Sequence, residues 1–136
     1  MSFPVASEVA FDYLVDPENR PAWQSSLRRV EQVVGAPGAG QRWVDVTKPG
    51  LRPQMRTTLF ERPGVSIPGR WAETGRWRGV TADLDLAFAA TPTGCDVTFR
   101  FSVRVLGPVG RAFTALSVPA VRADLRRAAE VLSRRS

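Results

Sequence analysis

Glu73 is the carboxylate in this sequence whose surroundings most favour chemistry. The side chains of residues 70–77 alternate, and Trp71, Glu73 and Trp77 fall on one face of an expected strand. If that face points inward, Glu73 lies in an apolar interior, where burial raises the pKa of a carboxyl group and suits it to general acid or base catalysis. Two alternatives stay open: an inward Glu73 paired with an arginine, or a strand of the opposite phase.

Three further side chains are candidates for a polar site. Asp45 shares a strand face with Trp43, and, as for Glu73, this face can point either into the core or toward solvent. Tyr13 is the only tyrosine, and it could donate a hydrogen bond to a ligand carbonyl or pack in the first helix. Asp124 could line a pocket or pair with arginines at the surface. The remaining carboxylates of the last strands are expected at the surface: Asp83, Asp85 and Asp96.

The residue types that are missing narrow the function classes. The sequence has no histidine and a single cysteine, Cys95. A catalytic triad that contains histidine is therefore impossible, a zinc site is improbable, and no internal disulfide can form. Lys48 is the only lysine and the only residue that could form a Schiff base. We expect neither a metal nor a cofactor.

The formal net charge of +6 first suggests a nucleic-acid partner. Nearly all of the basic residues, however, are arginines scattered along a chain that is also rich in alanine, valine and proline. Compositional bias explains this pattern more simply, so we expect no nucleic-acid partner. The densest cluster lies on an expected C-terminal helix, where a solvated face is the simplest interpretation. Its members are Arg122, Arg126, Arg127, Arg134 and Arg135.

The apolar periodicity predicts two short helices, a series of strands and a long last helix. The first helix covers residues 7–15 with Ser7 as its cap, and the second, capped by Asp16, continues through Trp23 to about residue 26. From about Val109 the pattern is helical to the end, and Pro119 is expected to kink or break that helix. The length predicts one domain, residues 1–136. Strands are expected over residues 28–34, 41–48, 55–61, 70–77, 80–88 and 97–105, with short turns typical of an antiparallel meander.

Three stretches carry a family resemblance: VAFDYLVDPENRPAW at residues 9–23, GQRW at residues 40–43 and DLRR at residues 124–127. Together with the order of elements, they resemble the START-like helix-grip superfamily, and within it the polyketide cyclase/dehydrase branch. The resemblance covers essentially the whole chain. It implies an α+β helix-grip fold, with a curved antiparallel sheet of six or seven strands, two short N-terminal helices and a long C-terminal helix across the sheet.

The resemblance also implies a cavity between the sheet and the C-terminal helix. The expected function is binding of a small hydrophobic molecule, lipid-, aromatic- or polyketide-like, as a carrier or sensor. The alternatives are a polyketide cyclase/dehydrase, with Glu73 and Tyr13 in proton transfer, and a module that binds nucleic acid or an acidic partner through the basic helix. For the tryptophans, packing of the core competes with ligand contact. The expected ligand-binding residues are Trp23, Trp43, Met55, Thr57, Trp71, Leu84, Leu86, Phe88, Phe99, Phe101, Leu116 and Ala120.

The segment before the first helix departs from the family pattern. Members of the family begin with a full strand before the first helix. Here only residues 1–6 precede the expected helix, and Pro4 interrupts them. We therefore expect either a short, weakly paired strand over residues 2–5 or a homodimer that covers the free strand edges. No basic leader precedes an apolar block, and no apolar stretch approaches the ~20 residues of a membrane span, so we expect a cytoplasmic protein.

Overall fold

The structure is a computed structural model that describes residues 1–105 and 109–135, without the side chains of residues 109–113 and 116. The chain begins with a two-residue strand and a helical pair, continues through six longer strands and ends in one long helix. The helical elements are α1 (Ser7–Val15), the 3-10 helix η1 (Pro17–Asn19), α2 (Arg20–Trp23) and α3 (Val109–Arg135). The strands are β1 (Ser2–Phe3), β2 (Leu27–Val34), β3 (Arg42–Thr47), β4 (Gln54–Glu61), β5 (Gly69–Trp77), β6 (Val80–Thr91) and β7 (Gly94–Arg104).

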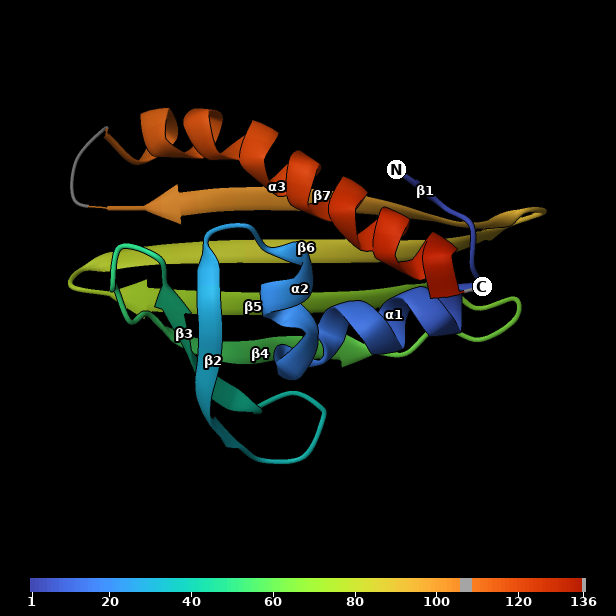
Figure 1. The fold of residues 1–136 in the computed structure, drawn as a ribbon, viewed down its shortest axis with the longest axis horizontal. Helices are drawn as coiled ribbons and strands as arrows, with labels where there is room; N and C mark the ends of the chain where they lie inside the picture. Colours follow the sequence, from blue (N-terminus) through green and yellow to red (C-terminus); the bar gives the residue numbers. More distant parts are fainter. Residues whose placement is uncertain (106–108, 136) are drawn as a thin grey trace.

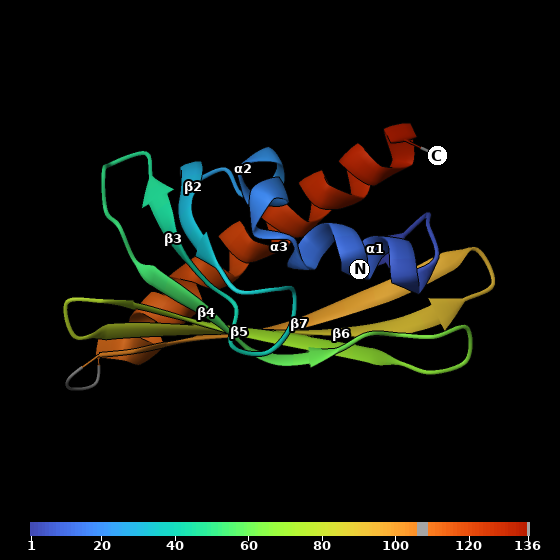
Figure 2. The same ribbon diagram turned by 90° about the horizontal axis from the view of Figure 1, so that it is seen from below.

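The strands form one antiparallel sheet in the order β1-β7-β6-β5-β4-β3-β2. Figure 1 shows α3 running along β7, with α1 and α2 beside it, while β2 crosses the direction of the long strands. In the turned view all three helices lie on one side of the sheet, and β2 and β3 curl toward that side (Figure 2). This arrangement confirms the expected helix-grip fold, with seven strands.

Alternation along β5 and β6 decides which side chains form the core. Trp71, Leu86 and Phe88 are almost completely buried on the face toward the helices. On the opposite face Asp83 accepts a hydrogen bond from the Thr74 hydroxyl at 2.6 Å and remains partly exposed. The phase in which Trp71 and Glu73 point inward is therefore the one the chain adopts.

The first helix covers one end of this face. Phe11 lies edge-on to Phe60 and to Phe88, with ring centroids 5.1 and 5.2 Å apart. Such edge-to-face pairs add to the stabilisation that burial of the rings provides. Ser7 was expected to cap α1, but the cap residue is Ala6 and Ser7 is the first helical residue. The expected cap at Asp16 is present, since its carboxylate accepts from the Glu18 backbone N–H at 3.0 Å.

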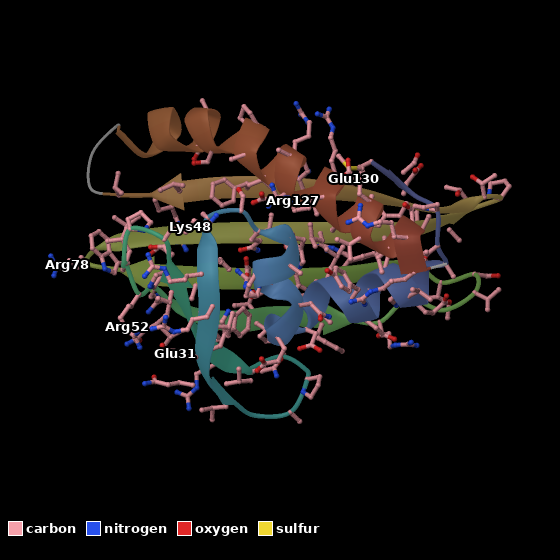
Figure 3. The ribbon with its side chains drawn as sticks, in the orientation of Figure 1. Glu31, Lys48, Arg52, Arg78, Arg127 and Glu130 are labelled. Atoms are coloured by element: carbon pink, nitrogen blue, oxygen red, sulfur yellow. The ribbon has the colours of Figure 1, made fainter. Side chains whose placement is uncertain are left out.

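The last helix packs through one stripe of side chains. Leu125, Ala128 and Leu132 are buried, whereas Arg127 and Glu130, labelled on α3 in Figure 3, are exposed. The expected break at Pro119 does not occur, because α3 is continuous from Val109 to Arg135. The proline itself is exposed to solvent. No helix among the described residues is long and apolar enough to cross a membrane.

The first strand is as short as expected and pairs only with β7, through Ser2 with Asp96 and Phe3 with Cys95. Gly94 lies so close beneath it that an added Cβ would overlap the Phe3 carbonyl oxygen. β1 does not reach β2, so the sheet is open between them. Whether a second copy covers these edges stays a prediction.

The other edge of the sheet, β2, is charged. Glu31 accepts from Arg29 at 2.6 Å and from Arg52, which precedes β4, at 2.7 Å (Figure 3). Hydrogen bonds from Arg52 and Arg29 lower the pKa of the Glu31 carboxyl to about 2. Charged side chains of this kind discourage edge-to-edge pairing with another sheet.

Candidate ligand-binding site

A cavity of about 330 Å³ lies between the inner face of the sheet and the helices α2 and α3. Strands β3 to β7 supply its floor and one wall, α2 and the start of β2 supply a second wall, and α3 supplies the third. Most of the lining is apolar. The apolar lining residues are Trp23, Leu27, Pro53, Met55, Gly75, Trp77, Val80, Ala82, Leu84, Phe101, Ala120 and Val121.

The cavity exists because the inward-facing side chains of the central strands become smaller from one end of these strands to the other. Trp71 faces Leu86 in the cross-strand register, and both are buried in the core near α1. Farther along, Gly75 faces Ala82, and these two residues supply almost no volume. A Cβ at Gly75 would stand only 2.7 Å from the Met55 sulfur, which extends over the glycine. The Met55 side chain takes part of the space above this small pair, and Met55, Gly75 and Ala82 all line the cavity.

A buried ion-pair cluster forms the polar end of the cavity. Arg20, at the start of α2, donates through Nε to Asp45 Oδ1 at 3.1 Å and through Nη2 to Asp45 Oδ2 at 2.9 Å. Its Nη1 donates to Glu73 Oε2 at 2.7 Å, and Nη2 also reaches Glu73 Oε1 at 3.3 Å. The three residues are only 2%, 4% and 5% exposed, in the order Arg20, Asp45 and Glu73. Such two-pronged bonds fix both carboxylates in place.

Neighbouring side chains hold this cluster together. The Trp43 indole N–H donates to Asp45 Oδ1 at 2.9 Å, and the Arg20 guanidinium lies 5.1 Å from the centre of the Trp43 ring. Gln24, one turn after Arg20, accepts from Nη2 at 3.3 Å. Trp43 therefore positions Asp45 and Arg20 and is not among the residues that line the cavity.

The cluster contains one guanidinium group and two carboxylates. Burial, opposed by Arg20 and assisted by Asp45, raises the pKa of Glu73 to about 6. Burial alone would lower the pKa of Arg20, but Glu73 and Asp45 raise it overall, so the guanidinium stays charged. Glu73 is thus a carboxyl group in the cavity wall whose pKa is raised toward neutrality.

This pKa predicts how stability depends on pH. The folded protein holds the Glu73 proton more tightly than the unfolded chain, whose carboxyl titrates near the ordinary value of 4.5. The stabilisation from this proton is present below pH 4.5 and is lost as the pH rises through 6. We expect the loss to be about 2 kcal/mol of unfolding free energy. Urea denaturation at intervals from pH 4.5 to 7 measures it.

Glu73→Gln is the matched control for that titration. It keeps an oxygen that can accept from Arg20 but carries no titrating proton, so its stability should lack the decline between pH 4.5 and 7. Glu31 acts in the opposite sense, and its contribution is lost as the pH falls from about 4.5 toward 2, mostly below this window. Parallel curves for the parent and Glu73→Gln would show that Glu73 does not titrate as described.

The cavity brings together only some of the residues expected to bind a ligand. Of the expected ligand-binding residues, five line it: Trp23, Met55, Leu84, Phe101 and Ala120. The expected catalytic residue Glu73 lines it as well. Phe99 lies instead under Arg122 of α3, 5.9 Å from its guanidinium. The Leu116 side chain lies outside the described part of α3. The expected residues that are buried in the core without lining the cavity are Trp43, Thr57, Trp71, Leu86 and Phe88.

Tyr13 does not share the cavity with Glu73. It lies in a separate groove formed with Pro4, Val9 and Leu132, and Arg135 of α3 stands 5.0 Å from its ring centre. Burial raises the pKa of the Tyr13 hydroxyl, while Arg135 opposes that rise. The expected proton-transfer pair is therefore separated, because Tyr13 faces the end of α3 rather than the middle of the sheet.

Sequence patterns did not identify one polar residue of the site, Arg20, and left the role of another, Asp124, undecided. Arg20 was not singled out, although two inward carboxylates on strands of one sheet require a buried cation nearby. Asp124 lines the cavity and accepts from the Ser25 backbone N–H at 3.2 Å and from its hydroxyl at 3.1 Å. This contact ties α3 to the segment between α2 and β2 at the cavity rim.

Comparisons with known proteins agree with this architecture. The crystal structure of Ara h 8.0201 superposes with a TM-score of 0.64 at 13% sequence identity, covering 98% of this chain and 94% of that chain. At this identity the likeness concerns the fold. No curated protein matches the sequence. The family model described as polyketide cyclase / dehydrase and lipid transport matches residues 1–136. Because that match spans the whole chain, the protein belongs to the polyketide cyclase/dehydrase and lipid transport family.

Proposed function

We propose that this protein binds a small hydrophobic molecule in the cavity between the sheet and α3, and acts as a carrier or sensor of that molecule. The observation that carries the proposal is the apolar cavity wall, in which Trp23, Trp77 and Phe101 offer large contact surfaces. Burial of apolar surface supplies affinity in such sites, and a few polar groups orient the ligand. Family membership supports the same function, since the family's description includes lipid transport.

The volume of the cavity sets the size of the ligand. An apolar cavity of about 150 Å³ accepts benzene, so about 330 Å³ accommodates a larger ring system or a medium-length alkyl chain. The ligand classes that fit are lipid-, aromatic- or polyketide-like molecules. A polar group on the ligand would meet the cluster of Arg20, Asp45 and Glu73 at one end of the cavity.

A polyketide cyclase or dehydrase is the second candidate, and Glu73 is the observation that favours it. A buried carboxyl with a pKa of about 6 can exchange a proton with a bound substrate near neutral pH. Tyr13 has no part in this version because it lies in another groove. Turnover of a polyketide by the parent and its loss in Glu73→Gln would support the enzyme, whereas equal turnover in both removes Glu73 from the chemistry.

Native mass spectrometry of the purified protein tests the carrier proposal. We expect a fraction of the chains to carry one small apolar molecule, which organic solvent releases. The control is Ala82→Trp, in which the indole occupies the cavity and the adduct should be absent. An adduct that persists equally in Ala82→Trp would contradict binding in this cavity.

A further inference from the structure

The charges that line the cavity are uneven. Among its described lining residues, Arg20 is the only cation, whereas three residues carry carboxylates: Asp45, Glu73 and Asp124. Arg20 is bonded to Asp45 and Glu73, so this buried cluster carries one more negative than positive charge when both carboxylates are ionised. A buried excess charge is costly unless another group compensates it.

The guanidinium of Arg20 has little capacity left for a ligand. Each of its three nitrogens already donates to a carboxylate oxygen, and Nη2 also reaches Gln24. A carboxylate or phosphate on a ligand would find at most the second N–H of Nη1 free, since Nη1 makes a single bond, and it would add another negative charge to the cluster. An anionic head group is therefore disfavoured at this end of the cavity.

The two carboxylates, in contrast, retain capacity to accept. Asp45 Oδ1 accepts from both Arg20 and Trp43. Glu73 Oε1, Glu73 Oε2 and Asp45 Oδ2 each accept one hydrogen bond, from Arg20, among the described residues. Since a carboxylate oxygen can accept about two hydrogen bonds, each of these three atoms has one position open. The cluster therefore has open acceptor positions and, when both carboxylates are ionised, one negative charge that Arg20 does not balance.

We propose, building on the ligand-binding function above, that the cavity selects a hydrophobic amine in its protonated form. The ammonium group donates to the open positions of Glu73 and Asp45 and neutralises the excess charge, while the apolar body lies against Trp23, Trp77 and Phe101. A primary ammonium carries three donors, as the lysine head group does. Aromatic rings in the wall add favourable contact with a nearby cation.

This selectivity is opposite to the one that the whole protein's charge would produce. The net charge of +6 attracts anions to the molecule from a distance. A preference for a cation must therefore come from the local cluster. Such a preference distinguishes binding at this site from unspecific attraction to the whole protein.

Three probes with the same chain and different head groups test the proposal: octylamine, 1-octanol and octanoate, titrated at pH 7 by isothermal calorimetry. We expect octylamine to bind about tenfold more tightly than 1-octanol, which corresponds to ~1.4 kcal/mol. Octanoate should bind most weakly. In Glu73→Gln the amine should lose this advantage while 1-octanol binds as before.

Asp85→Asn is the matched control, because it removes the same charge from the outer face of β6, beside Leu84 and Leu86. It should leave the preference for octylamine intact. If 1-octanol or octanoate binds as well as octylamine, or if Asp85→Asn changes the preference as much as Glu73→Gln, the selectivity for amines is wrong and the binding function stands. If none of the three probes binds the parent, the binding function is wrong and the selectivity falls with it.

Discussion

Arg20→Met is expected to lower the free energy of unfolding by about 3–5 kcal/mol at pH 7, the range seen when one partner of a buried ion pair is removed. Methionine has a similar length but leaves Asp45 and Glu73 buried and facing each other without a cation. Chemical denaturation with urea measures the loss. Because both carboxylates would then favour their protonated forms, the variant should regain part of its stability as the pH falls toward 5.

The triple variant Arg20→Met, Asp45→Asn, Glu73→Gln distinguishes the contribution of charge to stability from that of packing. It removes all three charges and keeps side chains of similar size, and the asparagine amide that replaces the Asp45 carboxylate keeps an oxygen that can accept from Trp43. Removing all the charges of a buried cluster costs less than leaving one charge unpaired, so we expect the triple variant to recover part of the loss, while the buried amide donors introduced at positions 45 and 73 keep it below the parent. A triple variant as unstable as Arg20→Met would mean that Arg20 stabilises the protein by packing rather than by charge.

The same cluster explains why a cavity can persist inside this fold. Toward α1, Phe11, Trp71 and Phe88 fill the space between helix and sheet completely. The bonds of Arg20 to Asp45 on β3 and to Glu73 on β5 tie α2 to the sheet just beyond that core. Asp124 connects α3 to Ser25, just after α2. The walls are thus held by polar contacts where apolar packing is missing.

The sequence predicted the sheet well because its strongest signals are local. Alternation along β6 and β7 identified the buried face. Alternation along β5 put Glu73 on the same face as Trp71 but left open whether that face is buried, and the structure buries both residues. The end of the second helix was placed a few residues too late, at about residue 26, whereas α2 ends at Trp23. Of the two outcomes expected at Pro119, a kink or a break, the break does not occur, because α3 continues through this residue.

The site was harder to predict because its contacts are distant in sequence. Arg20 lies 25 residues from Asp45 and 53 residues from Glu73, and no periodicity connects them. A strand pattern shows that a side chain points inward, but not whether it meets a cavity or solid core. Trp71 and Glu73 share one face, yet only Glu73 lines the cavity. The pairing of Glu73 with Tyr13 failed for the same reason, since inward side chains of different elements need not meet.

Ala82→Trp is expected to reduce the affinity for an apolar probe such as 1-octanol by about 100-fold, or ~2.7 kcal/mol of binding free energy. Ala82 lies on the cavity floor opposite Gly75, where the structure supplies almost no side-chain volume. An indole at this position occupies space that the ligand needs. Calorimetric titration of the parent and the variant measures the loss.

Stability provides a second, independent readout of the same change. Inserting a large side chain into a packed core costs typically about 1–3 kcal/mol, whereas an indole that enters an existing cavity gains contacts without that strain. We therefore expect Ala82→Trp to unfold at the same urea concentration as the parent or a higher one. Ala89→Trp, on the exposed face of the same strand, is the control and should leave probe affinity unchanged. Loss of affinity together with a loss of stability in Ala82→Trp would indicate a distorted core, and retained affinity would show that ligands bind elsewhere.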